Sequence, residues 1–448
     1  MYSYRQDIRF RYQAGWTETA CQLTGSISGG VGMALLSLGL LLVAIFLGFF
    51  RKMNTGLLCI AFALVLGRMA GVSDKEIISG FNSSLFIMLL GVTYLFSLAQ
   101  INGCLDLLAK KVVSLAGKRV YLVPIIIYVF STILSAIGPG TVPTMAIMMV
   151  FSMALAAEMG IQPAMLSALT VLGASGGGVS PLAATGIIGI NLCAEFGLTG
   201  IETQFLLNGV LSSTVYAVVV YVLLGGYKLR MDDNVVHEKT PPFNSKQKIT
   251  LAGIVAMVVL VMIFHINVGL VGFAVAAVLS FLQVSDEGEA LKRIPWGTLL
   301  LITGVGVLMH LIIGQGGIRM LSEALVSVMN EKTAVSIMGI CSGLLSWFSS
   351  TSGVVMPTLI PTIPHIVAQM GGAVSELELA TAITMISNTA GISPLSTGGA
   401  LALAAYSSAA GASYEEQHHL FVKMFMISAL GVLVLSIFAY FGLYHWIL

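Results

Sequence analysis

Two stretches of the chain share an unusual composition: GGGVSPLAATG at 176–186 and NTAGISPLSTGG at 388–399. Each interrupts a segment that is otherwise apolar. Because glycine costs about 1 kcal/mol and proline about 3 kcal/mol in a helix interior, a helix that carries such a run should unwind there. Inside a membrane, unwound backbone is tolerated only where protein or water surrounds it. A matched pair of broken helices therefore indicates the substrate site of a secondary transporter.

The composition is that of a polytopic membrane protein. Of the 448 residues, 57% are hydrophobic and 9% are charged, which is more apolar material than a water-soluble core can bury. The lipid bilayer is thus the expected surrounding. The net charge of +1 gives no reason to expect a nucleic-acid partner. The five cysteines show no paired spacing, and we predict no disulfide framework, metal site or cofactor.

The chain divides into two halves that repeat each other. Ser180-Pro181 recurs as Ser393-Pro394 at an offset of 213 (393 − 180), and Pro143 recurs as Pro357 at 214 (357 − 143). Between the halves, a charged segment with a Pro-Pro pair lacks an apolar period and is predicted to be a solvated linker. The expected organisation is an N-terminal segment at 1–31, a first repeat at 32–227, a cytoplasmic linker at 228–248 and a second repeat at 249–448.

Each half also contains an apolar stretch that is interrupted near its middle. The stretch 120–157 is broken at 138–143, and its counterpart is broken at 349–353, before Pro357. Since a helix needs about 20 residues to cross the bilayer, each stretch is predicted to be a re-entrant hairpin with a polar tip near the midplane.

The hairpins decide the predicted topology. With both hairpins counted as returns, each half crosses the membrane an odd number of times, so the second half should be inserted upside down. The predicted fold is an all-α polytopic membrane protein with two inverted-topology repeats, each with a re-entrant hairpin and a broken transmembrane helix. Most Lys and Arg residues lie on the side of the linker, which the positive-inside rule places in the cytoplasm.

The two hairpin tips and the two broken helices are expected to meet in one site. Helix N-termini there offer unpaired N–H groups and the positive end of the dipole, which suit an anion. Helix C-termini offer carbonyl groups, which suit a cation. The polar side chains in these segments are Ser, Thr and Asn. Small residues also allow close helix packing, but packing does not require proline at matched positions in both halves.

This layout resembles the ion transporter superfamily, and within it the divalent anion/sodium symporters and the bacterial malonate and dicarboxylate carriers. The resemblance extends from about Gly32 to Leu448. It implies transport of a small organic anion such as malonate or succinate, with sodium as the coupling ion. It also implies an elevator mechanism, a homodimer and a bacterial inner membrane. Neither tip contains the Ser-Asn-Thr of the symporters, so the exact anion and the coupling ion stay open.

The resemblance and the helix-end chemistry together give two sets of candidate residues. The expected substrate-binding residues are Gly138, Gly140, Thr141, Ser180, Pro181, Thr351, Ser352, Gly353, Ser393, Pro394 and Thr397. The expected cation-binding residues are Gly178, Val179, Ser349, Ser350, Asn388, Gly391 and Ile392.

Two alternatives use the same sequence features. One is an inorganic anion or arsenite exporter of the same superfamily. The other is an intramembrane serine protease, because 173–177 fits G-x-S-x-G with Ser175 as the nucleophile. A protease needs a base within hydrogen-bond reach, and His310 is the one histidine predicted well inside an apolar span. The repeated motif argues against an enzyme.

Overall fold

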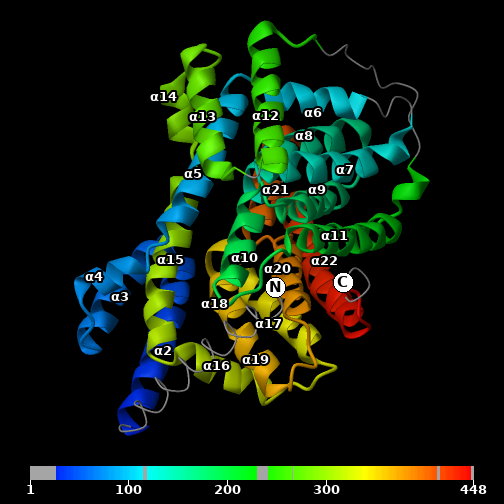
Figure 1. The fold of residues 1–448 in the computed structure, drawn as a ribbon. Coiled ribbons are helices and arrows are strands. Elements are labelled where there is room, and N and C mark those ends of the chain that lie inside the picture. The colour runs from blue at the N-terminus through cyan, green and yellow to red at the C-terminus, as the bar shows by residue number, and fades with distance from the viewer. Residues whose placement is uncertain (1–26, 115–118, 230–240, 265, 411–413, 445–448) are drawn as a thin grey trace.

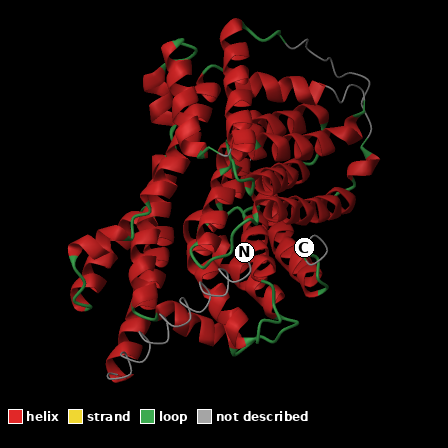
Figure 2. Cartoon of the chain, in the orientation of Figure 1, coloured by secondary structure: helices red, strands yellow, loops and turns green. Residues whose placement is uncertain are grey.

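The computed structural model describes residues 27–114, 119–229, 241–264, 266–410 and 414–444. This part of the chain is helical and contains no strand (Figures 1 and 2). Six of its helices are long and apolar enough to span a membrane: Val31–Gly48, Ser83–Ile101, Glu202–Leu223, Trp296–Gly314, Thr351–Gln369 and Glu415–Tyr440. The predicted all-α polytopic membrane fold is confirmed.

The first half of the chain forms a series of helices separated by short turns. They are α2 (Ile27–Arg51), α3 (Thr55–Met69), α4 (Asp74–Ser79), α5 (Ser83–Ile101), α6 (Cys104–Ser114), η1 (Val120–Leu122), α7 (Val123–Ala136), α8 (Thr141–Met159), α9 (Pro163–Gly178), α10 (Ala184–Ala194), α11 (Glu202–Leu223) and η2 (Gly226–Lys228). α2 begins inside the predicted N-terminal segment.

The second half repeats this order, except that the counterpart of α8 is divided into the four short helices η3, α18, η4 and α19. Its helices are α12 (Ser245–Phe264), α13 (Val268–Phe281), α14 (Glu287–Arg293), α15 (Trp296–Gly314), α16 (Gly317–Val326), α17 (Ala334–Phe348), η3 (Thr351–Val355), α18 (Met356–Leu359), η4 (Ile360–Thr362), α19 (Ile363–Gln369), α20 (Glu376–Ala390), α21 (Thr397–Ala410) and α22 (Tyr414–Tyr440). α12 begins inside the predicted linker, of which residues 230–240 lie outside the described part.

The two halves pack against each other through equivalent glycines. A β-carbon on Gly304 of α15 would overlap the backbone of Gly56 on α3, and one on Gly91 of α5 would overlap the backbone of Gly269 on α13. Gly56 and Gly269 are related by the offset of 213 (269 − 56), as are Gly91 and Gly304 (304 − 91). Glycine at these contacts lets the backbones approach closely. The same contact is therefore made twice, with the roles of the halves exchanged.

Figure 1 shows α6 and α14 toward one end of the molecule and their counterparts α16 and α4 toward the other. α5 and α15 lie side by side as a long column. This exchange of ends is what an inverted repeat requires. Its orientation in a membrane remains a prediction that labelling can test.

Single cysteines at Gln162, before α9, and at Ala373, before α20, should label from opposite faces of the membrane in a cysteine-free background. Both positions are exposed, and each follows the return arm of its own hairpin. The measurement is modification by a membrane-impermeant maleimide in intact and in permeabilised cells. Labelling of both positions from one face would contradict the inverted repeat.

Candidate functional site

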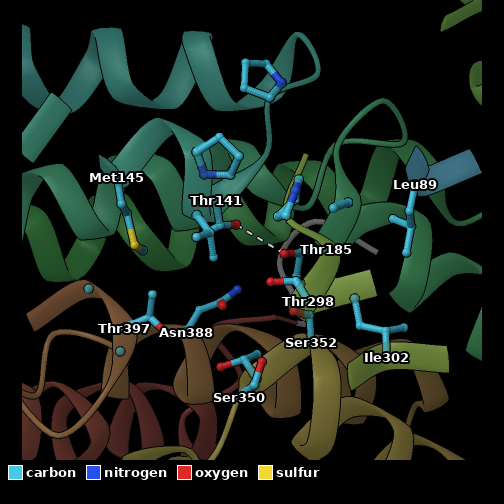
Figure 3. A pocket seen from close by; sticks show the side chains of 18 of the residues that line it. Leu89, Thr141, Met145, Thr185, Thr298, Ile302, Ser350, Ser352, Asn388 and Thr397 are labelled. Atoms are coloured by element: carbon cyan, nitrogen blue, oxygen red, sulfur yellow. Dashed lines mark hydrogen bonds between the residues drawn. The ribbon is translucent and has the colours of Figure 1, made fainter. Parts of the chain in front are cut away.

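A cavity lies where the two hairpin tips, the two broken helices, and helices α5 and α15 meet (Figure 3). The second tip contributes Ser350, Thr351 and Ser352, and the first contributes Pro139, Thr141, Val142, Pro143 and Met145. The predicted meeting of the four interrupted segments is thus present in the structure.

The first tip turns sharply between α7 and α8. Gly138 and Gly140 have φ values of 142° and 78°, which only glycine adopts readily. Ser135, at the end of α7, donates a hydrogen bond of 2.7 Å to the carbonyl oxygen of Ala174 on α9. A β-carbon on Gly140 would lie 3.2 Å from the backbone nitrogen of Ala184, the first residue of α10. The first tip is therefore held against the broken helix of its own repeat.

The second tip is held in an equivalent way. Ser346 of α17 donates a hydrogen bond of 2.8 Å to the carbonyl oxygen of Ser387 on α20, which is the counterpart of Ala174 (387 − 174 = 213). The Ser350 hydroxyl accepts a hydrogen bond of 3.1 Å from the N–H of Gly353 and caps the start of η3. The Ser346 and Thr351 hydroxyls lie 3.0 Å apart.

Both broken helices unwind around a Ser-Pro pair, over shorter stretches than predicted. α9 ends at Gly178 and α10 begins at Ala184, whereas α20 ends at Ala390 and α21 begins at Thr397. In the first turn the Ser180 hydroxyl accepts a hydrogen bond of 3.3 Å from the N–H of Leu182. In the second, the Ser393 hydroxyl accepts one of 3.2 Å from the N–H of Leu395.

Four helix N-termini converge on the cavity. They are the starts of α8, α10, η3 and α21, and residues from the first turn of each line it: Thr141, Val142, Ala184, Thr185, Thr351, Ser352, Thr397 and Gly398. The first N–H groups of a helix have no partner within the helix and carry its positive dipole end. None of the lining residues carries a charge. The site is therefore electropositive through backbone groups, which suits an anion.

Side chains complete this polar wall. The Thr141 and Thr185 hydroxyls lie 3.2 Å apart and join the first tip to α10 (Figure 3). Asn388 also lines the cavity, is 6% exposed, and has a side-chain nitrogen with no hydrogen-bond partner. An unpaired buried donor is costly unless a ligand or water occupies it.

The predicted site residues separate into two groups in the structure. Those that line the cavity are Thr141, Ser350, Thr351, Ser352, Asn388, Gly391 and Thr397. Those outside its lining are Gly138, Gly140, Gly178, Val179, Ser180, Pro181, Ser349, Gly353, Ile392, Ser393 and Pro394. We expected Ser180 and Ser393 to line the cavity, and this placement is wrong because both hydroxyls point back into their own turns.

Sequence reasoning missed the wall contributed by α5 and α15. Leu89, Thr93, Pro295, Thr298, Leu299 and Ile302 line the cavity from this side. The helical pattern of the sequence does not show which face of an all-apolar helix points toward a site. Leu89 and Ile302 are equivalent at the offset of 213 (302 − 89), but this does not distinguish them from the other apolar pairs of the two helices.

The geometry does not assemble a serine protease. The Ser175 hydroxyl is fully buried and has no hydrogen-bond partner. His310 lies on an exposed face of α15 and does not line the cavity. The base that a nucleophilic serine requires is therefore not beside it.

Comparison with known proteins agrees with a transporter. Residues 31–178 match the family model described as the N-terminus of the dicarboxylate carrier protein MatC. The fold is similar to the crystal structure of the YdaH transporter of Alcanivorax borkumensis, described as having an unusual topology. The TM-score is 0.57 at 13% sequence identity, over 84% of this chain and 89% of YdaH. No curated protein sequence matches the chain.

These findings point to a membrane transporter rather than an enzyme. Its first third resembles the dicarboxylate carriers, as the sequence motifs predicted.

Proposed function

We propose that the protein is a secondary active transporter of small dicarboxylates, coupled to sodium, that works by an elevator-type mechanism. The observation that carries the proposal is the convergence of four helix N-termini on an uncharged, hydroxyl-lined cavity. Such a site binds an anion without a fixed cation. The proposal includes a homodimer in a bacterial inner membrane, as the family resemblance implies.

The two carboxylates of a dicarboxylate match the two halves of the site in number, because each repeat contributes one pair of helix N-termini. The first repeat contributes the starts of α8 and α10, and the second contributes the starts of η3 and α21. Each pair of N-termini offers backbone N–H groups and threonine hydroxyls to one carboxylate, through Thr141 and Thr185 in one half and Thr351 and Thr397 in the other. Hydrogen bonds to a charged group contribute about 1.5–3 kcal/mol each.

The size of the cavity fits a short anion. Its volume is about 80 Å³, and about 10–15 Å³ of such volume holds one water molecule. The site therefore has room for more than one water-sized group. Short dicarboxylates such as malonate and succinate are the candidates that we propose for it.

Sodium is the favoured coupling ion because the cavity has no titratable lining residue that could carry a proton. The unwound turns offer neutral ligands instead. Backbone carbonyl groups at the C-terminal ends of α9 and α20, around Gly178, Val179, Gly391 and Ile392, are the ligand type that a bare sodium ion requires. The oxygens of Ser349, Ser350 and Asn388 add to these.

An elevator mechanism needs two bodies with the substrate site between them. The cavity lies between α5 and α15 on one side and the helices that carry the tips and the broken helices on the other. A separate hydrophobic core, which includes Leu41, Cys59, Leu66, Val305 and Leu308, joins α2, α3 and α15. We infer that the column of α5 and α15 is the scaffold. The two tips would then move against this scaffold together with the substrate.

Purified protein in proteoliposomes should take up labelled malonate or succinate when an inward sodium gradient is imposed, and uptake should fall to background in sodium-free buffer. Monocarboxylates, tricarboxylates and arsenite serve as comparison substrates. Full activity with a proton gradient alone would contradict sodium coupling. Transport of arsenite without any dicarboxylate would favour an inorganic anion exporter.

A further inference from the structure

The cavity has two unlike walls. Hydroxyls and helix N-termini form one, whereas α5 and α15 form the other with Leu89, Leu299 and Ile302. Figure 3 shows Leu89 and Ile302 on one side and Met145 and Thr397 on the opposite side. Leu89 and Leu299 are 1% exposed and Ile302 is 3% exposed. These side chains are packed in place and close the cavity on the side of α5 and α15.

The second wall has little to offer a carboxylate. Thr93, one of its two hydroxyl residues, donates its hydrogen bond to the carbonyl oxygen of Leu89 at 2.8 Å. Its leucine and isoleucine side chains have no polar group. Thr298, the other hydroxyl residue, also lines the cavity. A carboxylate pressed against Leu89, Leu299 or Ile302, in contrast, would lose water without gaining a partner. An anion longer than the polar wall would therefore have to place a carboxylate against these apolar side chains, at a cost in desolvation.

We propose that Leu89 and Ile302 set the upper limit on the chain length of the transported dicarboxylate. The inference rests on the proposed function and adds the residues that determine specificity. The two positions are equivalent in the two repeats (302 − 89 = 213), so each limits the site from its own half. One methylene in a hydrophobic pocket changes discrimination by roughly tenfold to two-hundredfold. Shortening either side chain should move the limit by about one methylene or more.

The test compares dicarboxylates of increasing length as substrates. Half-saturating concentrations for malonate, succinate, glutarate and adipate are measured by uptake into proteoliposomes for the wild type, Leu89→Ala and Ile302→Ala. The wild type should prefer the two shorter anions. Each variant should lower the ratio of the glutarate to the malonate half-saturating concentration by roughly tenfold or more.

Matched controls lie on the same helices. Ile87 of α5 and Leu300 of α15 are each 38% exposed and do not line the cavity, so Ile87→Ala and Leu300→Ala should keep the wild-type ratio. Leu89→Val and Ile302→Val remove one carbon each and should give a smaller shift in the same direction if an alanine variant does not fold. Uptake of malonate with an unchanged length profile in all four cavity variants would overturn the length limit alone. A wild type that takes up no dicarboxylate would overturn the proposed function as well.

Discussion

Replacing Gly186 or Gly399 with alanine should reduce transport by at least tenfold. Both glycines are the third residue of the second part of a broken helix, α10 or α21, and they are equivalent (399 − 186 = 213). A β-carbon on Gly186 would overlap the carbonyl oxygen of Ser180, and one on Gly399 would overlap that of Ser393. The obstacle in each case is backbone, which cannot rotate away as a side chain can.

The overlap should displace the turn from the helix N-terminus that lines the cavity. Overpacking costs about 1–3 kcal/mol, and here the movement separates the N–H groups of one half-site from the tip. We expect initial uptake to fall by at least tenfold while the protein still purifies as a folded species. Sodium-dependent dicarboxylate uptake, normalised to reconstituted protein, measures the effect.

Gly39→Ala is the matched control, because Gly39 lies within α2 and a β-carbon there meets nothing within 4 Å. Alanine is favoured over glycine in a helix by about 1 kcal/mol, so this variant should be at least as stable as the wild type. Normal uptake by both Gly186→Ala and Gly399→Ala would show that the turns can shift without affecting the site.

The breaks in the helices could be predicted because their cause is local. Proline and glycine disfavour the interior of a helix, and Pro181 and Pro394 lie inside the observed turns. The prediction was too wide at Gly176 and Gly177, which remain helical. A β-carbon there would overlap Ser213 of α11 or the carbonyl oxygen of Thr132 on α7. Those glycines allow close packing, which the local sequence does not distinguish from unwinding.

The role of Ser180 and Ser393 was also open to sequence reasoning. A serine hydroxyl often accepts a hydrogen bond from the N–H two residues later and so stabilises a turn. Both serines do this, which explains why they are repeated without lining the cavity. In contrast, Leu89 and Ile302 reach the cavity through the rotation of α5 and α15. That rotation depends on contacts between helices distant in sequence, such as those of Gly91 and Gly304.

Asn388→Asp should reduce anion uptake by more than any deletion of a hydroxyl group. The change preserves the shape of the side chain but replaces a donor with a negative charge in a cavity without charged residues. Two unit charges 4 Å apart repel by about 4 kcal/mol at an effective dielectric constant of about 20, which is roughly a thousandfold in affinity. Asn388→Ala should lose only one hydrogen bond, or roughly tenfold to a hundredfold. Half-saturating concentrations for malonate or succinate measure both effects.

The same variant separates the two roles open to Asn388. If its amide nitrogen, which has no partner in the structure, donates to the substrate, aspartate repels the anion and Asn388→Ala is the milder change. If its oxygen instead binds the coupling ion, aspartate keeps that ligand and should lower the sodium concentration needed for half-maximal uptake. Asn330→Asp, at an exposed position before α17, controls for the added charge. Unchanged uptake by Asn388→Asp would contradict both roles. The anion would then have to bind away from the second broken helix.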